Sequence, residues 1–190
     1  MRREEIVQAA LSLIATEGPG ALTTPAIALA VGVSQGAVFR HFATKLDILI
    51  ACVDWIGNQV SGAVIRAAAE PGTAEHRLRH IVAALLAVAK SIPAMPTTMF
   101  SRELHAEFPQ LHEHLSERRR RFHGTLEGLL ADGVASGEFA AGLDIGAAAH
   151  LVFGMVHSLL FRWHHIDRDL DLDGQGAVMV GLLLDGLKRR

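Results

Sequence analysis

The stretch from Thr23 to Leu49 constrains the fold more than any other part of this 190-residue chain. Its pattern predicts two short helices joined by a glycine turn, followed by the start of a third helix. Thr24 is a suitable N-cap, with Pro25 at the first helical position. Gly32 is expected to end the first helix, because so tight a turn needs a residue that tolerates positive φ. The stretch therefore predicts a helix-turn-helix at about residues 24–43.

The second helix of this stretch has the composition of a helix that enters the major groove of DNA. Ser34 is a second N-cap, and we expect the helix over residues 35–42, with Val38 and Phe42 facing inward. A helix-turn-helix reads base edges from the N-terminal part of this helix. An amide can pair with adenine, a guanidinium with guanine, and a methyl group can touch that of thymine. The residues expected to face outward are Gln35, Ala37, Arg40 and His41.

Several nearby positions are suited to holding the DNA backbone. Helix N-termini and short polar side chains bind phosphate groups, and a glycine lets the backbone approach DNA closely. The expected contacts of this kind are Arg3, Thr24, Ser34, Gly36, His41 and Lys45. A helical hairpin that only packs inside the protein is the alternative that spacing leaves open.

The first fifty residues resemble the N-terminal domain of the TetR family of bacterial transcriptional repressors. The matching positions are Ile6-Val7-Gln8-Ala9-Ala10, Glu17-Gly18, Thr23-Thr24, Ile27-Ala28, Val31-Gly32-Val33-Ser34, Gly36, His41-Phe42 and Lys45. In one position the chain departs from this pattern, because similar proteins usually carry Tyr where this chain has Phe39. In those similar proteins, the resemblance implies, the hydroxyl of this tyrosine reaches a DNA phosphate. This chain has no Tyr, so Phe39 can pack against the sugar-phosphate but cannot donate that bond.

The charge of the chain argues mildly against nucleic acid as a partner. Its net charge is −2, and residues 1–50 hold as many acidic as basic residues. DNA-binding domains usually carry a basic surface. The cations are, however, placed where the motif would present them to DNA, and a dimer would double their number. We therefore predict modest non-specific affinity and a shallow dependence on salt.

The composition indicates a folded, helical protein. Half of the residues are hydrophobic, which excludes a disordered chain. Helical periodicity recurs along the chain and strand patterns are scarce. We predict an all-α fold with a three-helix helix-turn-helix DNA-binding domain at 1–48, and an α-helical ligand-binding and dimerisation bundle at 49–190. The expected helices cover residues 3–16, 45–69, 73 onward, a short segment ending at 109, 109–136, 145–165, and a last one ending at 188.

The expected location is the cytoplasm, with no membrane partner. No uninterrupted apolar run reaches the roughly 20 residues of a membrane span, and the N-terminus MRREEIVQ lacks the apolar core of a signal peptide. The single Cys52 excludes an internal disulfide. We expect it to be a buried small apolar residue, with redox sensing as the alternative.

The last two expected helices are rich in small and apolar residues on more than one face. Such helices need a second surface to cover them, and small residues let helix axes approach closely. A two-fold four-helix interface between two copies is the simplest cover, and the resemblance implies the same homodimer. Enclosure of these helices within one subunit is the alternative.

Large side chains in the middle of the chain could line an apolar cavity for an effector. The resemblance implies such a cavity, with occupancy changing the spacing of two DNA-binding heads. The candidate ligand-binding residues are Trp55, Met99, Phe100, Arg118, Phe122, Phe153 and His157. Ordinary core packing is the alternative for each of them. Arg118 lies on the apolar stripe of its helix, so it could receive the acidic head of an effector, or be paired or solvated within the protein.

Three histidines, His150, His157 and His164, recur at seven-residue spacing on one expected helix. Residues seven apart lie about 10.5 Å apart along a helix, too far to share one ion directly. A metal site would need partners such as His105 or His112. We therefore predict that these are satisfied structural histidines, with no metal ligand and no cofactor. The alternatives are that they line the cavity, that they lie across the dimer axis and sense pH, or that they sense a metal.

These features predict a ligand-responsive, DNA-binding transcriptional regulator. It would be a homodimeric repressor that a small, largely apolar effector releases from a palindromic operator. The chain lacks a His-Glu-x-x-His motif, a nucleophile elbow and a phosphate loop, so we do not expect an enzyme. The alternatives are a metal- or redox-sensing regulator with the same head, or a small helical enzyme.

Overall fold

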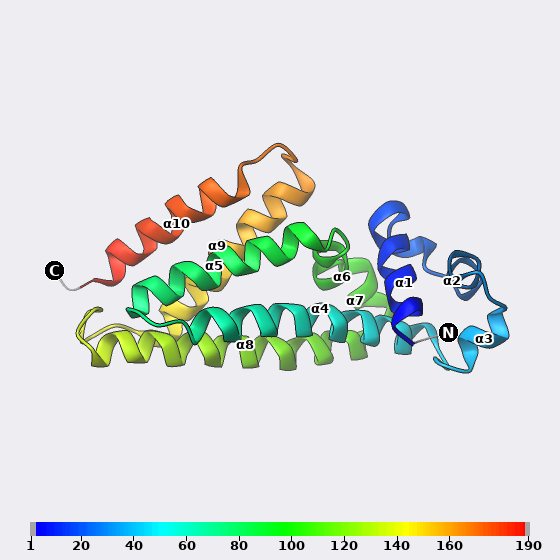
Figure 1. Ribbon diagram of the computed structural model, residues 1–190, viewed down its shortest axis with the longest axis horizontal. Helices are drawn as coiled ribbons and strands as arrows, with labels where there is room; N and C mark the ends of the chain where they lie inside the picture. Colours follow the sequence, from blue (N-terminus) through cyan, green and yellow to red (C-terminus); the bar gives the residue numbers. More distant parts are fainter. Residues whose placement is uncertain (1–2, 189–190) are drawn as a thin grey trace. The chain divides into compact units, whose positions relative to one another are not determined.

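The computed structural model of the protein describes residues 3–188, except for the side chain of Phe100. This part of the chain forms helices and no strand (Figure 1), which confirms the predicted all-α class. The helices pack as two compact units. The first holds the residues up to Asn58 together with Ile92–Arg118, and the second holds Gln59–Ser91 and the residues from Arg119 onward.

The first unit is built around α1 (Arg3–Glu17). This helix packs against η1 (Pro19–Ala21) and α2 (Thr24–Val31), and α2 packs against α3 (Gln35–Phe39). The sequence pattern predicts that Leu13 faces inward with Ile6 and Ile14, but Leu13 is half-buried and Leu11 is buried instead. The buried face also includes Val7, which moves its centre toward Leu11 and away from Leu13 at 100° per residue. The unit also contains α6 (Met95–Phe100), α7 (Arg102–Glu107) and the first parts of α4 (Lys45–Ala68) and α8 (Pro109–Ala135).

The N-terminus of α4 is fixed by a reciprocal pair of hydrogen bonds. The Thr44 Oγ1 accepts the N–H of Asp47 at 3.1 Å, and the Asp47 Oδ2 accepts the N–H of Thr44 at 2.9 Å. This is a capping box, which satisfies two backbone donors that a helix start would otherwise leave free. The sequence Thr44-Lys45-Leu46-Asp47 predicts a helix cap at Thr44, which these bonds confirm, and the cap sets Lys45 in the first turn of α4.

The second unit packs α5 (Ala74–Ser91), α9 (Ile145–His165) and α10 (Leu172–Leu187) together, with the later parts of α4 and α8. Asp144 and Asp171 begin α9 and α10, and their carboxylates accept the N–H groups of Ala147 and Gly174 at 2.9 and 3.0 Å. Apolar periodicity in the sequence predicts one inward-facing stripe on α5, and all five of its residues are buried: Leu78, Ile81, Val82, Leu85 and Leu86.

By length and average composition, α4 and α9 are apolar enough to cross a membrane. The prediction of no membrane span rests on the length of uninterrupted apolar runs. That criterion misses a helix whose average composition is apolar but whose apolar residues are interrupted by polar ones. In the fold, α9 packs against α5 and α10 and buries residues such as Val152 and Leu160 in the core of the second unit. Its apolar character thus serves protein packing in this structure.

Candidate nucleic-acid interface

The first helix of the predicted DNA-binding motif is capped by a different residue from the one expected. The Thr23 Oγ1 accepts the N–H of Ala26 at 3.2 Å, and Thr23 has the extended backbone that a cap requires. Thr24 is already the first helical residue, with Pro25 after it. The prediction that Thr24 is the N-cap is therefore wrong by one residue, because two adjacent threonines fit the cap pattern equally well.

The turn between α2 and α3 has the predicted form. Gly32 adopts a left-handed conformation with φ of 76°, which other residues seldom adopt. The Ser34 Oγ then accepts the N–H of Ala37 at 3.3 Å and begins α3. The regular helix ends earlier than expected, at Phe39, and one further turn is held by the bond from the N–H of Phe42 to the carbonyl of Val38 at 3.0 Å.

The exposed side of α3 is formed by Gln35, Gly36, Phe39 and Arg40. These positions fall within about 140° of arc at 100° per residue, so one groove could contact all of them. Ala37 was predicted to share this side, but it is only 8% exposed. It lies two residues after Gln35, about 200° round the helix, and the two side chains cannot face the same way. The predicted contact of Ala37 with a thymine methyl is therefore withdrawn.

Phe39 is 52% exposed, which is unusual for a phenylalanine. We expect Phe39→Tyr to tighten operator binding, because the added hydroxyl could donate a hydrogen bond to a phosphate. Such a bond contributes about 1 kcal/mol in each chain, so the two bonds of a dimer should raise operator affinity by about 2 kcal/mol, or about 30-fold, if they add. Fluorescence anisotropy with a labelled operator measures this gain. Phe39→Leu is the control and should not tighten binding; unchanged affinity for Phe39→Tyr would contradict the expected contact.

Two further candidates for phosphate contacts lie together at the end of α3. The Arg3 guanidinium lies 4.2 Å from the centre of the Phe42 ring. Its Nη1 also donates to the carbonyl oxygen of His41 at 3.5 Å. These contacts hold the cation of α1 beside His41, which is half-buried. Arg3 and His41 thus lie in the same place on the first unit, as a shared phosphate contact would require.

Lys45 makes contacts that its sequence position did not predict. Its Nζ lies 3.2 Å from the Glu107 Oε1 and 5.4 Å from the centre of the Phe108 ring. Both charged side chains are partly exposed, so this ion pair contributes little to stability and can be exchanged for another anion. If Lys45 contacts a DNA phosphate, as predicted, Glu107 would compete with that phosphate for the ammonium group.

We expect Lys45→Ala to weaken binding to every duplex alike and to reduce the slope of log affinity against log salt by about 0.9 per chain. Glu107→Gln should act in the opposite direction and raise affinity for all duplexes about 2- to 5-fold, the amount that a surface ion pair contributes. Anisotropy titrations at several salt concentrations measure both effects. A change confined to one DNA sequence would exclude the phosphate role of Lys45.

In the second unit, three of the predicted ligand-binding residues meet. The rings of Phe122 and Phe153 have centres 6.1 Å apart, and those of Phe153 and His157 are also 6.1 Å apart. All three side chains are half-buried. Burial, with a smaller contribution from the charge of Arg119, lowers the pKa of His157, which favours the neutral imidazole. The cluster is therefore aromatic and uncharged at neutral pH.

A pocket of about 390 Å³ in the same unit is lined by Arg119, Arg120, His123, Glu127 and His150. The rings of His123 and His150 lie 4.5 Å apart, and that of His123 lies 5.1 Å from Phe153. Burial, followed by the neighbouring His150, lowers the pKa of His123. From the sequence, we predict that Arg119–Arg121 form a solvated face, because nothing in their spacing marks a pocket. Arg119 and Arg120 border the aromatic cluster through His123.

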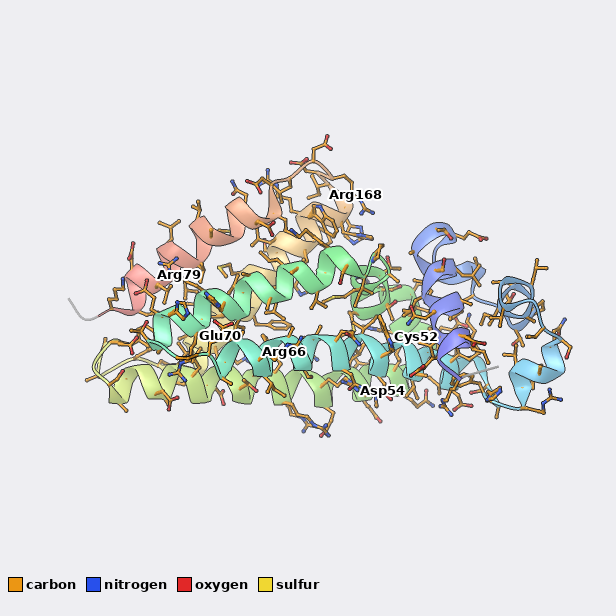
Figure 2. The ribbon with its side chains drawn as sticks, viewed as in Figure 1. Cys52, Asp54, Arg66, Glu70, Arg79 and Arg168 are labelled. Atoms are coloured by element: carbon orange, nitrogen blue, oxygen red, sulfur yellow. The ribbon has the colours of Figure 1, made fainter. Side chains whose placement is uncertain are left out.

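The remaining ligand-binding candidates belong to the first unit. Trp55 and Met99 are half-buried, and the side chain of Phe100 lies outside the described residues. Arg118 donates to the Asp54 Oδ1 from Nη2 at 2.6 Å and from Nε at 3.2 Å (Figure 2 shows Asp54 on α4). His114 lies 2.7 Å from the same oxygen atom. An acidic effector that bound Arg118 would have to replace Asp54.

The Asp54 carboxylate is held in its charged form by these partners. Burial alone would raise its pKa, but the hydrogen bonds from Arg118 and His114 outweigh this effect and lower the pKa below its usual value. Removal of Arg118 would therefore also leave a partly buried carboxylate short of donors.

Cys52 is fully buried on α4, with its Sγ 3.9 Å from the carbonyl oxygen of Val7 (Figure 2). Burial raises the pKa of its thiol to about 12. The reactive thiolate is thus disfavoured, and so is its access to oxidants. The environment is that of a small apolar core residue, which argues against the redox-sensing alternative.

Comparison with known proteins finds two matching family models and relatives that match most of the chain. Residues 6–52 match the model described as bacterial regulatory proteins, tetR family, and residues 71–187 match the tetracyclin repressor-like C-terminal domain. The fatty acid metabolism regulator protein of Bacillus subtilis is 27% identical over 98% of this chain and 95% of its own length. The nucleoid occlusion factor SlmA of Photobacterium profundum is 26% identical over 85% of this chain and 83% of its own length.

The fold is likewise found in a solved structure. The crystal structure of the regulator FadR from Bacillus subtilis, in complex with stearoyl-CoA, superposes with a TM-score of 0.83. It is 23% identical and covers 98% of this chain and 100% of that one.

Proposed function

This chain belongs to the TetR family of bacterial DNA-binding transcriptional regulators, and we propose that it acts in the cytoplasm as a homodimeric repressor on a palindromic operator. The observation that carries this proposal is the exposed face of α3, where Gln35, Gly36, Phe39 and Arg40 share one side after a tight glycine turn. In a dimer, the two copies of α3 would enter major grooves about 34–36 Å apart, or a multiple of that distance.

The dimer we propose is formed by α9 and α10. Large apolar side chains are exposed on both helices, although the unit has a core of its own. We call this surface the apolar α9–α10 face; it consists of Leu151, Phe161, Val178 and Leu182. Large exposed apolar side chains of this kind are typical of a protein–protein interface, and a second copy related by a two-fold axis would cover them with the same residues.

The effector we propose is a fatty acyl thioester of coenzyme A. The aromatic cluster of Phe122, Phe153 and His157 offers an apolar surface for an acyl chain. The adjoining pocket carries Arg119 and Arg120, whose guanidinium groups suit phosphates. The name of the Bacillus subtilis relative and the stearoyl-CoA in the FadR structure support the same class of ligand.

A release assay tests both parts of this proposal. Duplexes selected from random DNA are first bound by the full chain, and stearoyl-CoA, free coenzyme A and stearate are then added separately. We expect release by stearoyl-CoA alone, because only it carries both the acyl chain and the phosphates. Binding without release by any of the three would exclude the effector class and leave the DNA-binding function standing. Failure to select any duplex would contradict the function itself.

A further inference from the structure

A cluster of two imidazoles and a carboxylate lies at the turn between α4 and α5 and shares no residue with the surfaces described above. Its members are Glu70, His76 and His80, and one potential ligand atom from each lies within 4.8 Å of the others. The Glu70 Oε2 contacts the His80 Nδ1 and lies 3.6 Å from the His76 Nε2. The two imidazole rings have centres 4.1 Å apart. Figure 2 labels Glu70 at this turn.

The local backbone brings these three side chains together. His76 and His80 are four residues apart on α5, so their side chains lie on one face of the helix. The Thr73 Oγ1 caps the helix by accepting the N–H of His76 at 3.1 Å. Gly72 has a φ of 134°, and a Cβ added there would lie 3.0 Å from the His76 Cδ2. Because Gly72 has no side chain, the backbone of the turn can lie close to the His76 ring. This conformation places Glu70 beside the first turns of α5.

We propose that Glu70, His76 and His80 form a binding site for a divalent transition-metal ion, with Zn²⁺, Ni²⁺ and Co²⁺ as the ions of matching chemistry. Imidazole nitrogens bind these ions, whereas Mg²⁺ and Ca²⁺ take oxygen ligands. Two His and one Glu are also a ligand set that zinc uses when a fourth position stays open for water. The Glu70 carboxylate supplies negative charge that offsets the positive end of the α5 dipole.

A bound ion would join the end of one helix to the start of the next. The α4 helix ends at Ala68 and α5 begins at Ala74, and the three ligands come from both sides of this connection. The ion would therefore hold the turn between α4 and α5 in one conformation, at the opposite end of α4 from Lys45. Without a metal, the Glu70 carboxylate contacts the two imidazoles directly.

A titration of tag-free, full-length protein with Co²⁺ separates these two interpretations. The protein is first treated with a chelator and dialysed, and Co²⁺ binding is followed by its visible absorption and then by displacement with Zn²⁺. We expect one ion per chain. Each of Glu70→Gln, His76→Gln and His80→Gln should weaken binding by at least about 10- to 100-fold, the loss that even outer-shell changes cause at metal sites.

The controls exclude non-specific binding and loss of the fold. His112→Gln removes another exposed helical imidazole and should leave the affinity unchanged. The three ligand side chains are 40–46% exposed, so their replacement leaves the core intact, and an unchanged circular dichroism spectrum checks this. The proposal is overturned if the triple variant binds Co²⁺ as the unaltered chain does, or if the unaltered chain binds none.

Discussion

Replacing Leu182 by Glu should convert the protein from a dimer into a monomer that has lost high-affinity binding to its operator. Leu182 lies on the apolar α9–α10 face and is 70% exposed in the single chain. Burying one leucine contributes about 1.5–3 kcal/mol. A two-fold interface contains the substitution twice, so dimerisation should lose about 3–6 kcal/mol, or about 10²- to 10⁴-fold in its constant. The cost of burying two carboxylates adds to this loss.

Light scattering coupled to size-exclusion chromatography measures the oligomeric state, and anisotropy measures operator binding by the same sample. Ile65→Glu is the matched control, since Ile65 is 62% exposed on α4 and lies outside the apolar α9–α10 face. This variant should stay dimeric and keep its affinity. A dimer that persists in Leu182→Glu would show that the two copies meet elsewhere.

Arg40→Ala should remove base discrimination at one position in each half of the operator. Arg40 is exposed beyond the last residue of α3, where its guanidinium can form two hydrogen bonds with guanine. Such a bidentate contact contributes about 1–3 kcal/mol of discrimination. Both half-sites lose it in a dimer, so affinity for the selected operator should fall by about 2–6 kcal/mol if the losses add. Gln35→Ala should have the same kind of effect at a different base pair, through adenine.

The measurement compares the affinities of wild-type protein and Arg40→Ala for the operator and for each single-base variant of it. Arg66→Ala is the control, because it removes an exposed guanidinium from α4 without touching α3. It should leave base preference intact. If Arg40→Ala weakened all duplexes equally and kept the same preferences, Arg40 would be a phosphate contact rather than a base contact.

Local signals in the sequence were sufficient to predict most of the helices. Caps such as Ser34, Thr44 and Asp144, and the left-handed Gly32, act over three or four residues, so their partners can be identified along the chain. The errors within the motif are also local. Thr23 and Thr24 fit the N-cap pattern equally well, so the cap was predicted one residue too late. Ala37 was predicted on the exposed side of α3 but is buried.

Long-range pairings could not be predicted in the same way. Lys45 meets Glu107, and Arg118 meets Asp54, across separations of 62 and 64 residues. Neither partner is marked by periodicity, because each is a charged residue on a partly exposed helical surface. These pairings bear on the predicted roles of both residues, because a DNA phosphate at Lys45 or an acidic effector at Arg118 would have to replace a carboxylate. The histidine pair at 76 and 80 carried a usable signal, four-residue spacing on a helix, but Glu70 joins it only through the turn at Gly72.

The most direct test of the central claim is a selection of binding sites from random duplex DNA, carried out in parallel with the wild-type chain and the double variant Gln35→Ala/Arg40→Ala. If the exposed face of α3 reads bases in two copies, the wild-type protein will enrich an inverted repeat. The double variant will then lose the sequence preference at defined positions in each half. Enrichment of the same repeat by both proteins, or of no sequence by the wild-type chain, would contradict the claim.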